Sequence, residues 1–323
     1  MIKENIINLP DQLDFSPEIK NKEKWGSSER YFLCGMGGSH LQGDILKSIL
    51  PEFPLHLHEG YGLPALFSKN FNLITASYSG NTEEVLDSFD RALSEGVEPA
   101  VISRGGKLLE VAKERELPYV ELPEEDIQPR LGTGYSFKAL LALLGLEEKL
   151  EGETRSAREN LLGKREKIDE KAKELVHLLE GGIPVVHASR DNEVLARLFK
   201  INFNETTKIP AFYNVVPELN HNEMNGYEAS LEAMGLCENI KFLLLTDRND
   251  HPRNKKRMEV LKGMMKERDF EVLDVEAEGE TRMEKVFFSL MLSGLTSYHL
   301  AGHYGTDPEG VPMVEEFKKR MKE

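Results

Sequence analysis

The sequence is poor in cysteine and in long apolar runs, and each shortage excludes a class of protein. Cys34 and Cys237 are the only cysteines among 323 residues, and they lie far apart in the chain. They exclude a disulfide-stapled scaffold and a CxxC metal site, and they predict a reducing cytoplasm. No apolar run approaches the roughly 18–20 residues of a membrane span. The first residues, Met1–Asn5, lack the apolar core of a signal peptide, so neither membrane nor export is expected.

Positive charge is also scarce. Lysine and arginine together number 41 against 56 acidic residues, which gives a net charge of −15. Such a field disfavours nucleic acid and anionic membranes as partners. An anionic small substrate would therefore have to be held by a local pocket.

Short apolar strands alternate with helical segments, which predicts an α/β fold with parallel sheets flanked by helices. The same order occurs twice, which indicates an internal duplication with domains at residues 1–150 and 151–323. A charged helix over Gly152–Glu180 is expected to connect them. The predicted strands are Arg30–Cys34, Pro54–His58, Asn72–Ala76, Ala100–Ser103 and Tyr119–Leu122 in the first half, and Pro184–Ala188, Ala211–Val216, Lys241–Thr246 and Glu271–Val275 in the second.

The run Ser77-Tyr78-Ser79-Gly80-Asn81-Thr82-Glu83-Glu84 carries the clearest chemical signal. It lies between a predicted strand and a helix that runs to about Ser94. Backbone N–H groups, the helix dipole and the hydroxyls of Ser77, Ser79 and Thr82 suit a phosphate dianion. No Gly-Lys-Ser/Thr follows, which excludes a Walker loop. The competing interpretation is an ordinary helix N-cap with acidic residues in the first turn.

Two further turns also follow predicted strands. Gly35-Met36-Gly37-Gly38 follows the first strand, but residue 40 is His, so the dinucleotide pattern G-x-G-x-x-G fails. A tight turn that lets the backbone approach a sugar fits as well, and Ser39 adds a hydroxyl at the helix start. In the second half, the counterpart of the Ser77 loop is Asp247-Arg248-Asn249-Asp250, whose carboxylates would repel a phosphate.

These motifs carry a family resemblance. Gly35–Ser39 with Gly43-Asp44, together with Ser77–Thr82, resemble the sugar isomerase (SIS) domain. The chain as a whole resembles the bifunctional phosphoglucose/phosphomannose isomerases. Further segments support the narrower resemblance, and together with these motifs they span nearly the whole chain. The segment Pro217–Glu223 is the most specific. The supporting segments are Gln128-Pro129-Arg130, Asn204-Glu205-Thr206-Thr207-Lys208, Pro217-Glu218-Leu219-Asn220-His221-Asn222-Glu223, and Asp307-Pro308 before Glu315-Glu316-Phe317-Lys318.

The resemblance implies an aldose–ketose isomerase that interconverts glucose 6-phosphate and fructose 6-phosphate, and usually mannose 6-phosphate, without a metal, nucleotide or other cofactor. It implies a homodimer in which His221 reaches the neighbouring subunit's site. The implied substrate contacts are Gly37, Gly38, Ser39, Ser77, Ser79 and Thr82, and the implied catalytic residues are Glu205 as base, His221 for ring opening, Arg130 beside the reacting carbons and Lys318 near the ring oxygen.

The residue types suit this chemistry. One carboxylate can remove a proton from the carbon next to a carbonyl and return it to the adjacent carbon through a cis-enediol. A guanidinium, always protonated, can stabilise the developing oxyanion, and an imidazole can pass a proton during ring opening near pH 7. Each residue also has a structural alternative. Glu205 could be a solvated carboxylate, His221 a loop cap, Arg130 a surface charge, and Lys318, like its neighbour Lys319, part of a solvated helix face.

Other functions remain open from the sequence. SIS modules also serve as non-catalytic sugar-phosphate sensors, and an isomerase of a different phosphosugar is a further alternative. Ser293-Gly294 and Glu309-Gly310 depart from the family pattern. The resemblance links a threonine near the second of these positions to the mannose epimer, so the mannose 6-phosphate activity stays open from the sequence. The histidine pairs His56/His58 and His299/His303 have spacings compatible with metal binding. Neither pair has a nearby set of acidic or sulfur ligands that completes a site, so no metal site is expected.

Overall fold

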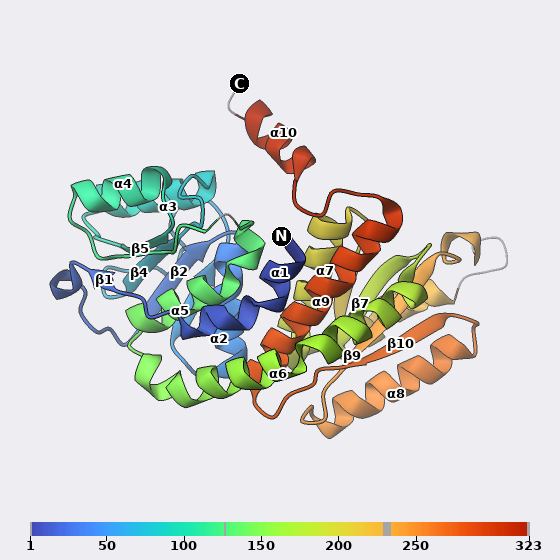
Figure 1. Ribbon diagram of the computed structural model, residues 1–323. Helices are drawn as coiled ribbons and strands as arrows, with labels where there is room; N and C mark the ends of the chain where they lie inside the picture. Colours follow the sequence, from blue (N-terminus) through green and yellow to red (C-terminus); the bar gives the residue numbers. More distant parts are fainter. Residues whose placement is uncertain (1, 126, 229–233, 322–323) are drawn as a thin grey trace. The chain divides into compact units, whose positions relative to one another are not determined.

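The computed structural model describes residues 2–125, 127–228 and 234–321 (Figure 1). The chain forms two compact units. The N-terminal unit comprises Asn8–Leu162, and the C-terminal unit comprises Met1–Ile7 with Gly163–Glu323. The boundary between Leu162 and Gly163 falls inside the long helix α6 (Glu147–Leu179), twelve residues after the division expected at residue 150. The first seven residues join the C-terminal unit because α1 (Ile2–Ile7) packs on α9 (Arg282–Tyr304), where Ile6 lies against Gly294.

The N-terminal unit is a six-stranded sheet in the order β1-β6-β5-β4-β2-β3, parallel except for β1. All five residues of β2 are buried, as expected for a central strand covered on both faces. Its strands are β1 (Ile19–Lys20), β2 (Tyr31–Gly35), β3 (Leu55–His58), β4 (Asn72–Ala76), β5 (Ala100–Ser103) and β6 (Tyr119–Glu121), and its helices are α2 (Gly38–Ile49), α3 (Glu83–Ser94), α4 (Gly106–Glu114), α5 (Thr133–Leu143) and the first half of α6 (Glu147–Leu179).

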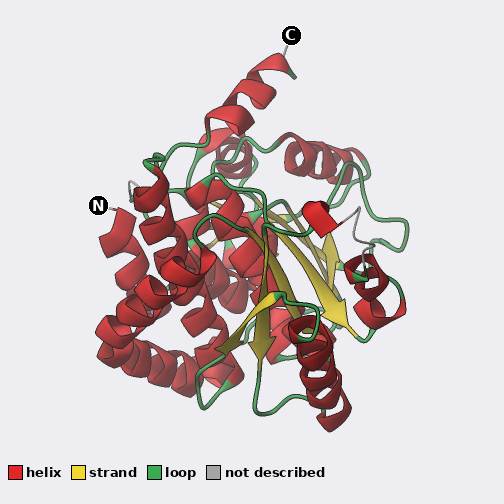
Figure 2. Cartoon of the chain, turned by 90° about the vertical axis from the view of Figure 1, so that its right-hand side faces the viewer, coloured by secondary structure: helices red, strands yellow, loops and turns green. Residues whose placement is uncertain are grey.

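The C-terminal unit contains a four-stranded parallel sheet in the order β10-β9-β7-β8. Figure 2, coloured by secondary structure, shows strands with helices around them. Helix α8 covers one face through Met258 and Leu261, which pack with Phe242 and Leu244 of β9. The elements are α1 (Ile2–Ile7), β7 (Ile183–Ser189), α7 (Glu193–Asn202), β8 (Phe212–Val216), β9 (Ile240–Thr246), α8 (Pro252–Lys266), β10 (Glu271–Glu276), α9 (Arg282–Tyr304) and α10 (Pro312–Arg320).

The predicted strands are confirmed, with ends that shift by at most one residue. The two sheets also share a strand order: β5-β4-β2-β3 in one corresponds to β10-β9-β7-β8 in the other, as an internal duplication requires. Strand β1 was not predicted. It is two residues long and pairs antiparallel with the sheet edge, so it carries no periodic signal of its own. No helix in the described part of the chain is both long and apolar enough to span a bilayer.

Candidate functional site

Three loops leave neighbouring strands at the same edge of the N-terminal sheet. Strand β2 leads to Gly37, β4 to Ser77 and β5 to Gly105, and these strands are adjacent in the order β5-β4-β2. Because the strands are parallel, their carboxyl ends meet at one edge, which is where ligands bind in open α/β sheets. The predicted phosphate loop therefore lies at the edge of the sheet where ligands bind in this type of fold.

The Ser77 loop is arranged around its own hydroxyls. Ser77 Oγ and Thr82 Oγ1 are 2.8 Å apart, and Asn81 N donates to Ser79 Oγ at 3.3 Å. Thr82 occupies the N-cap position of α3, but its side chain is turned to Ser77 and not to the N–H groups of its own helix. Those N–H groups thus remain directed at the loop, which favours the anion-binding interpretation over an ordinary N-cap.

Glycine is needed where the Ser77 loop meets the loop after β5. Gly80 has φ +69°, and a Cβ there would lie 1.7 Å from the carbonyl oxygen of Gly105. A Cβ on Gly106 would lie 2.4 Å from the carbonyl oxygen of Ser79. The two loops are therefore locked backbone to backbone, which fixes the hydroxyls before any ligand arrives.

The glycine turn after β2 joins the same group. Ser39 Oγ accepts a hydrogen bond from Tyr78 N at 2.9 Å, which ties the start of α2 to the Ser77 loop. A Cβ on Gly38 would lie 3.6 Å from Arg130 Cα, so Arg130 is a direct neighbour of the turn. Arg130 is only 7% exposed, which removes the surface-arginine alternative. The structure thus brings together the seven site residues predicted in this unit.

Two residues of this site were not predicted from the sequence. Gln12 is buried and clamps the Arg130 segment: its Nε2 donates to the Leu131 carbonyl at 2.6 Å, and its Oε1 accepts from Gly134 N at 2.9 Å. Arg104 follows β5 at the same edge and lies 5.5 Å from the ring centre of Tyr78. Arg104 supplies a positive charge beside a loop that has none of its own. Gln12 gives no local signal, because its partners lie more than a hundred positions away.

Glu205 lies in the C-terminal unit, on a π-helical turn over Phe203–Thr207 at the end of α7. Such turns are rare and occur often at functional sites. The backbone is fixed from several sides. Thr207 Oγ1 donates to the Ser297 carbonyl at 2.9 Å, Lys208 Nζ donates to the Glu205 carbonyl, and Asn202 Nδ2 donates to Ser293 Oγ of α9 at 2.9 Å. The Glu205 carboxylate is partly buried, unlike that of a solvated surface glutamate.

His221 is exposed at the end of a 3₁₀ turn over Glu218–His221. Two residues later, Glu223 anchors this segment to the sheet. Its carboxylate bonds His187 Nε2 at 2.8 Å and also Asn214 and Tyr227. Burial by itself would raise the pKa of the Glu223 carboxyl, but the hydrogen bonds from His187, Tyr227 and Asn214 lower that pKa to about 2. The His221 loop is therefore pinned by a carboxylate that stays ionised at neutral pH.

Glu205 and His221 of one chain lie near opposite ends of β8. The Glu205 turn precedes the strand and the His221 turn follows it. The strand of five residues between the two turns is about 16 Å long. Lys318 is on α10, whose described residues are all outside the core, and it is exposed. Glu205, His221 and Lys318 thus lie on three separate segments of the C-terminal unit.

In the C-terminal unit, the turn that corresponds to the Ser77 loop contains the buried carboxylate of Asp247. Asp247, directly after β9, is 6% exposed and pairs with Lys285 Nζ, and its other oxygen lies 3.4 Å from Arg282 Nη1. The positive charges of Lys285 and Arg282 at this edge are thus paired with a carboxylate of the same unit. This internal pairing is in keeping with the predicted asymmetry between the two halves.

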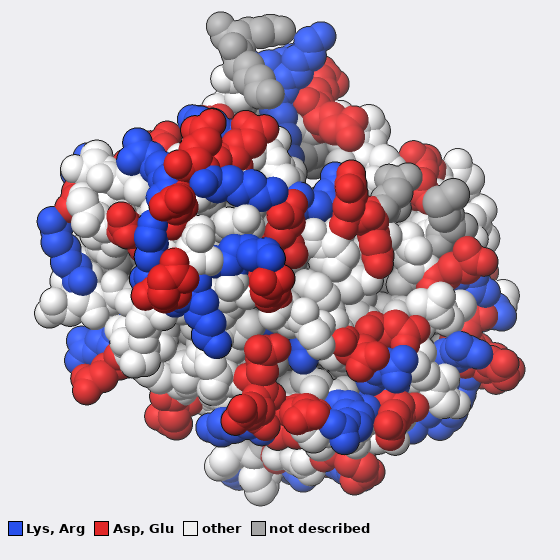
Figure 3. Space-filling model, turned by 60° about the vertical axis from the view of Figure 1, so that its left-hand side comes forward, with Lys and Arg blue, Asp and Glu red and all other residues white. Residues whose placement is uncertain are grey.

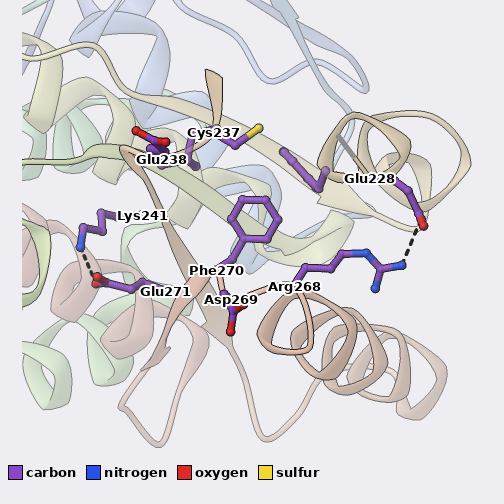
Figure 4. A pocket seen from close by; sticks show the side chains of 10 residues that line it. Glu228, Cys237, Glu238, Lys241, Arg268, Asp269, Phe270 and Glu271 are labelled. Carbon is purple, nitrogen blue, oxygen red and sulfur yellow. Dashed lines mark hydrogen bonds and ion pairs between the residues drawn. The ribbon is translucent and has the colours of Figure 1, made fainter. Parts of the chain in front are cut away.

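A separate cavity of about 470 Å³ lies at the amino ends of β9 and β10 (Figure 4). Two ion pairs lie among its lining residues: Arg268 Nη2 is 3.0 Å from Glu228 Oε2, and Lys241 pairs with Glu271 on the neighbouring strand. Glu238 and Asp269 add two further carboxylates. The cavity is at the amino edge of the sheet, away from the carboxyl edge where ligands of this fold bind. It therefore does not compete with the Ser77 loop as the candidate phosphate site.

Comparisons with known proteins agree with this geometry. Residues 168–321 match the family model described as the bacterial phospho-glucose isomerase C-terminal SIS domain. The bifunctional phosphoglucose/phosphomannose isomerases of Aquifex aeolicus and Caldicellulosiruptor bescii are each 33% identical to this chain. The alignments cover 90% and 99% of this chain, and 89% and 98% of those proteins.

One further relative and one solved structure are also similar to this chain. The D-glucosamine-6-phosphate 4-epimerase of Sulfolobus acidocaldarius is 31% identical over 66% of this chain and 67% of its own length. Among solved structures, the hypothetical protein TT0462 of Thermus thermophilus superposes with a TM-score of 0.76 at 16% identity, covering 99% of this chain and 90% of that one. The structural likeness shows the shared fold.

Proposed function

Because the chain belongs to the family of bifunctional phosphoglucose/phosphomannose isomerases, we propose that it interconverts glucose 6-phosphate, fructose 6-phosphate and mannose 6-phosphate. The observation that carries this proposal is the 33% identity over nearly the full chain to relatives of that name. The locked Ser77 loop supports it, because its paired hydroxyls and free helix N–H groups suit the phosphate that all three sugars share.

In the proposed mechanism, the phosphate binds at Ser77, Ser79 and Thr82, while Gly37, Gly38 and Ser39 line the sugar. Glu205 transfers a proton between the first two carbons through a cis-enediol. The buried Arg130 guanidinium stabilises the negative oxygen that develops. The mechanism uses only groups of the protein and needs no metal or nucleotide.

We further propose that the active unit is a homodimer in which His221 opens the ring in the partner subunit's site. The separation of Glu205 and His221 along β8 supports this arrangement. Lys318 on the exposed α10 would then meet the ring oxygen or first hydroxyl. The free Cys34 and Cys237 fit a cytoplasmic enzyme, in keeping with a role in hexose phosphate metabolism.

Nucleic acid is not among the proposed partners. The face in Figure 3 carries lysine and arginine side chains interspersed with aspartate and glutamate. Together with the net charge of −15, this mixture gives no extended basic surface on that face for a phosphate backbone.

A coupled assay of the purified protein tests the activity. Fructose 6-phosphate should yield glucose 6-phosphate, and a second coupling system should detect mannose 6-phosphate. Glucosamine 6-phosphate is included because one relative carries a 4-epimerase name. Turnover of glucosamine 6-phosphate alone would replace the proposal with epimerisation. Binding of all four sugars without turnover would indicate the non-catalytic sensor.

A further inference from the structure

Three potential metal ligands converge in the N-terminal unit, and none of them is a residue proposed for catalysis or substrate binding. His40 and Asp44 are one helical turn apart on α2, and Glu59 directly follows β3. His40 Nε2 lies 3.3 Å from Asp44 Oδ1 and 3.0 Å from Glu59 Oε1. One ligand atom from each of the three residues lies within 4.8 Å of the other two.

The balance of donors and acceptors distinguishes this cluster from the other histidine–carboxylate pairs. Asp169 meets Lys3 and Lys173 besides His299, so several cations share one carboxylate. At His40 the ratio is reversed, because one ring nitrogen faces two carboxylates. A ring nitrogen carries at most one hydrogen, which cannot bond both oxygens well. A cation in place of that hydrogen would be bound by all three groups at once.

The His40 ring is buried, and its second nitrogen makes no competing contact in the described part of the chain. His40 is 5% exposed, and its Nδ1 is buried without a hydrogen-bond partner among the described residues. The polar contacts of the His40 ring in the described structure are therefore those to Asp44 and Glu59. The Asp44 and Glu59 side chains are 20% and 38% exposed, which leaves a path from solvent to the buried nitrogen.

The distances suit a small divalent ion. In a tetrahedral zinc site with bonds of about 2.0–2.1 Å, neighbouring ligand atoms are about 3.3 Å apart. The two distances from His40 are close to this value. One imidazole nitrogen with two carboxylate oxygens suits zinc and other first-row transition metals, whereas magnesium and calcium favour oxygen ligands alone.

We propose that His40, Asp44 and Glu59 bind a divalent transition-metal ion, with Zn²⁺ as the expected occupant and solvent at the remaining position. The ion would connect the start of α2 to the end of β3. It would also brace Ser39, the neighbour of His40, whose hydroxyl is bonded to the Ser77 loop. The site stabilises this unit and takes no part in the isomerisation.

Isothermal titration of the full-length protein with zinc chloride, after EDTA treatment and dialysis, tests the proposal. The wild type should bind one ion per chain with a rise in melting temperature. His40→Ala and Glu59→Gln should each weaken binding at least about tenfold, a loss comparable to or larger than that from removing an outer-shell partner. His177→Ala, which removes an exposed imidazole on α6, should bind as the wild type does.

Cobalt(II) provides a second readout, because its visible absorption reports a low-coordinate site with a nitrogen ligand. The band expected for the wild type should disappear in Glu59→Gln, whose partly exposed side chain can be changed without disturbing the core. Circular dichroism verifies that each variant is folded. Failure of the wild type to bind either metal, or equal binding by the wild type and Glu59→Gln, would overturn the proposal whatever the isomerase activity.

Discussion

Single hydroxyls of the Ser77 loop should govern how tightly the substrate binds. A lost hydrogen bond to a charged group costs about 1.5–3 kcal/mol, so Ser79→Ala or Thr82→Ala should raise KM about tenfold or more. The turnover number should change less, since the phosphate is remote from the reacting carbons. Steady-state kinetics with fructose 6-phosphate give both values.

Ser94→Ala is the matched control for these two variants. Ser94 is exposed at the far end of α3, where its hydroxyl donates to the Arg91 carbonyl at 2.7 Å. The control should keep the wild-type KM. If both loop variants keep it as well, the phosphate does not bind at this loop.

Glu205→Gln should separate proton transfer from ring opening. The amide keeps the shape of the carboxylate but cannot act as a base, so kcat should fall about 10²–10⁴-fold. KM should change little, and exchange between the α and β anomers of glucose 6-phosphate, followed by NMR, should continue. Glu174→Gln, an exposed position on α6, serves as the control. Near-normal turnover by Glu205→Gln would disprove the role of Glu205 as base.

At the scale of elements, the Glu223 network should make the stability of the His221 segment depend on pH. The folded-state pKa of about 2 lies below the ordinary value of 4.5, so the ionised form is the stabilising one. This stabilisation, on the order of 2–3 kcal/mol, is complete above about pH 5 and is lost as the pH falls toward 2. Urea unfolding of the wild type and Glu223→Gln should therefore differ at pH 6 and converge in acid. A constant difference across this range would contradict the network.

The buried ion pair of Asp247 and Lys285, in the turn that corresponds to the Ser77 loop, should stabilise the C-terminal unit. Asp247→Asn leaves the 2%-exposed Lys285 without its counter-charge, which should cost about 3–5 kcal/mol of unfolding free energy. Adding Lys285→Met should recover part of that loss. Asp274→Asn, at a partly exposed pair with Lys262, should cost less than about 1 kcal/mol. Urea denaturation measures all three, and equal losses at the two aspartates would refute the argument.

At the scale of the whole molecule, the separation of Glu205 and His221 along β8 predicts complementation between subunits. Glu205→Gln and His221→Ala should each be inactive alone. A mixed dimer holds one site with both groups intact and one that lacks both, so mixing should restore part of the activity. Subunit exchange is verified with differently tagged chains. Exchange without recovery would place His221 in its own chain's site or outside catalysis.

Much of the fold could be predicted because each strand carries its own signal. The run Asn72–Ala76 is apolar, and the helix after it shows apolar residues at helical spacing, so both are visible in a short window. The chemistry of the Ser77 loop could be predicted for the same reason. Strand β1 could not, because two residues paired with a sheet edge show no period. Neither could the π turn that holds Glu205, since its shape depends on contacts with α9.

The sequence by itself determined the strands other than β1, the main helices and the polar composition of the turns at Ser77 and Asp247, because these features arise from neighbouring residues. Tertiary structure alone decided which distant side chains meet. Gln12 reaches Leu131 across 119 positions, Arg130 lies against Gly38, and His40 faces Glu59. Such contacts depend on how strands are ordered in the sheet and on which face each helix covers. No local pattern encodes them, because the chain must fold before those side chains become neighbours.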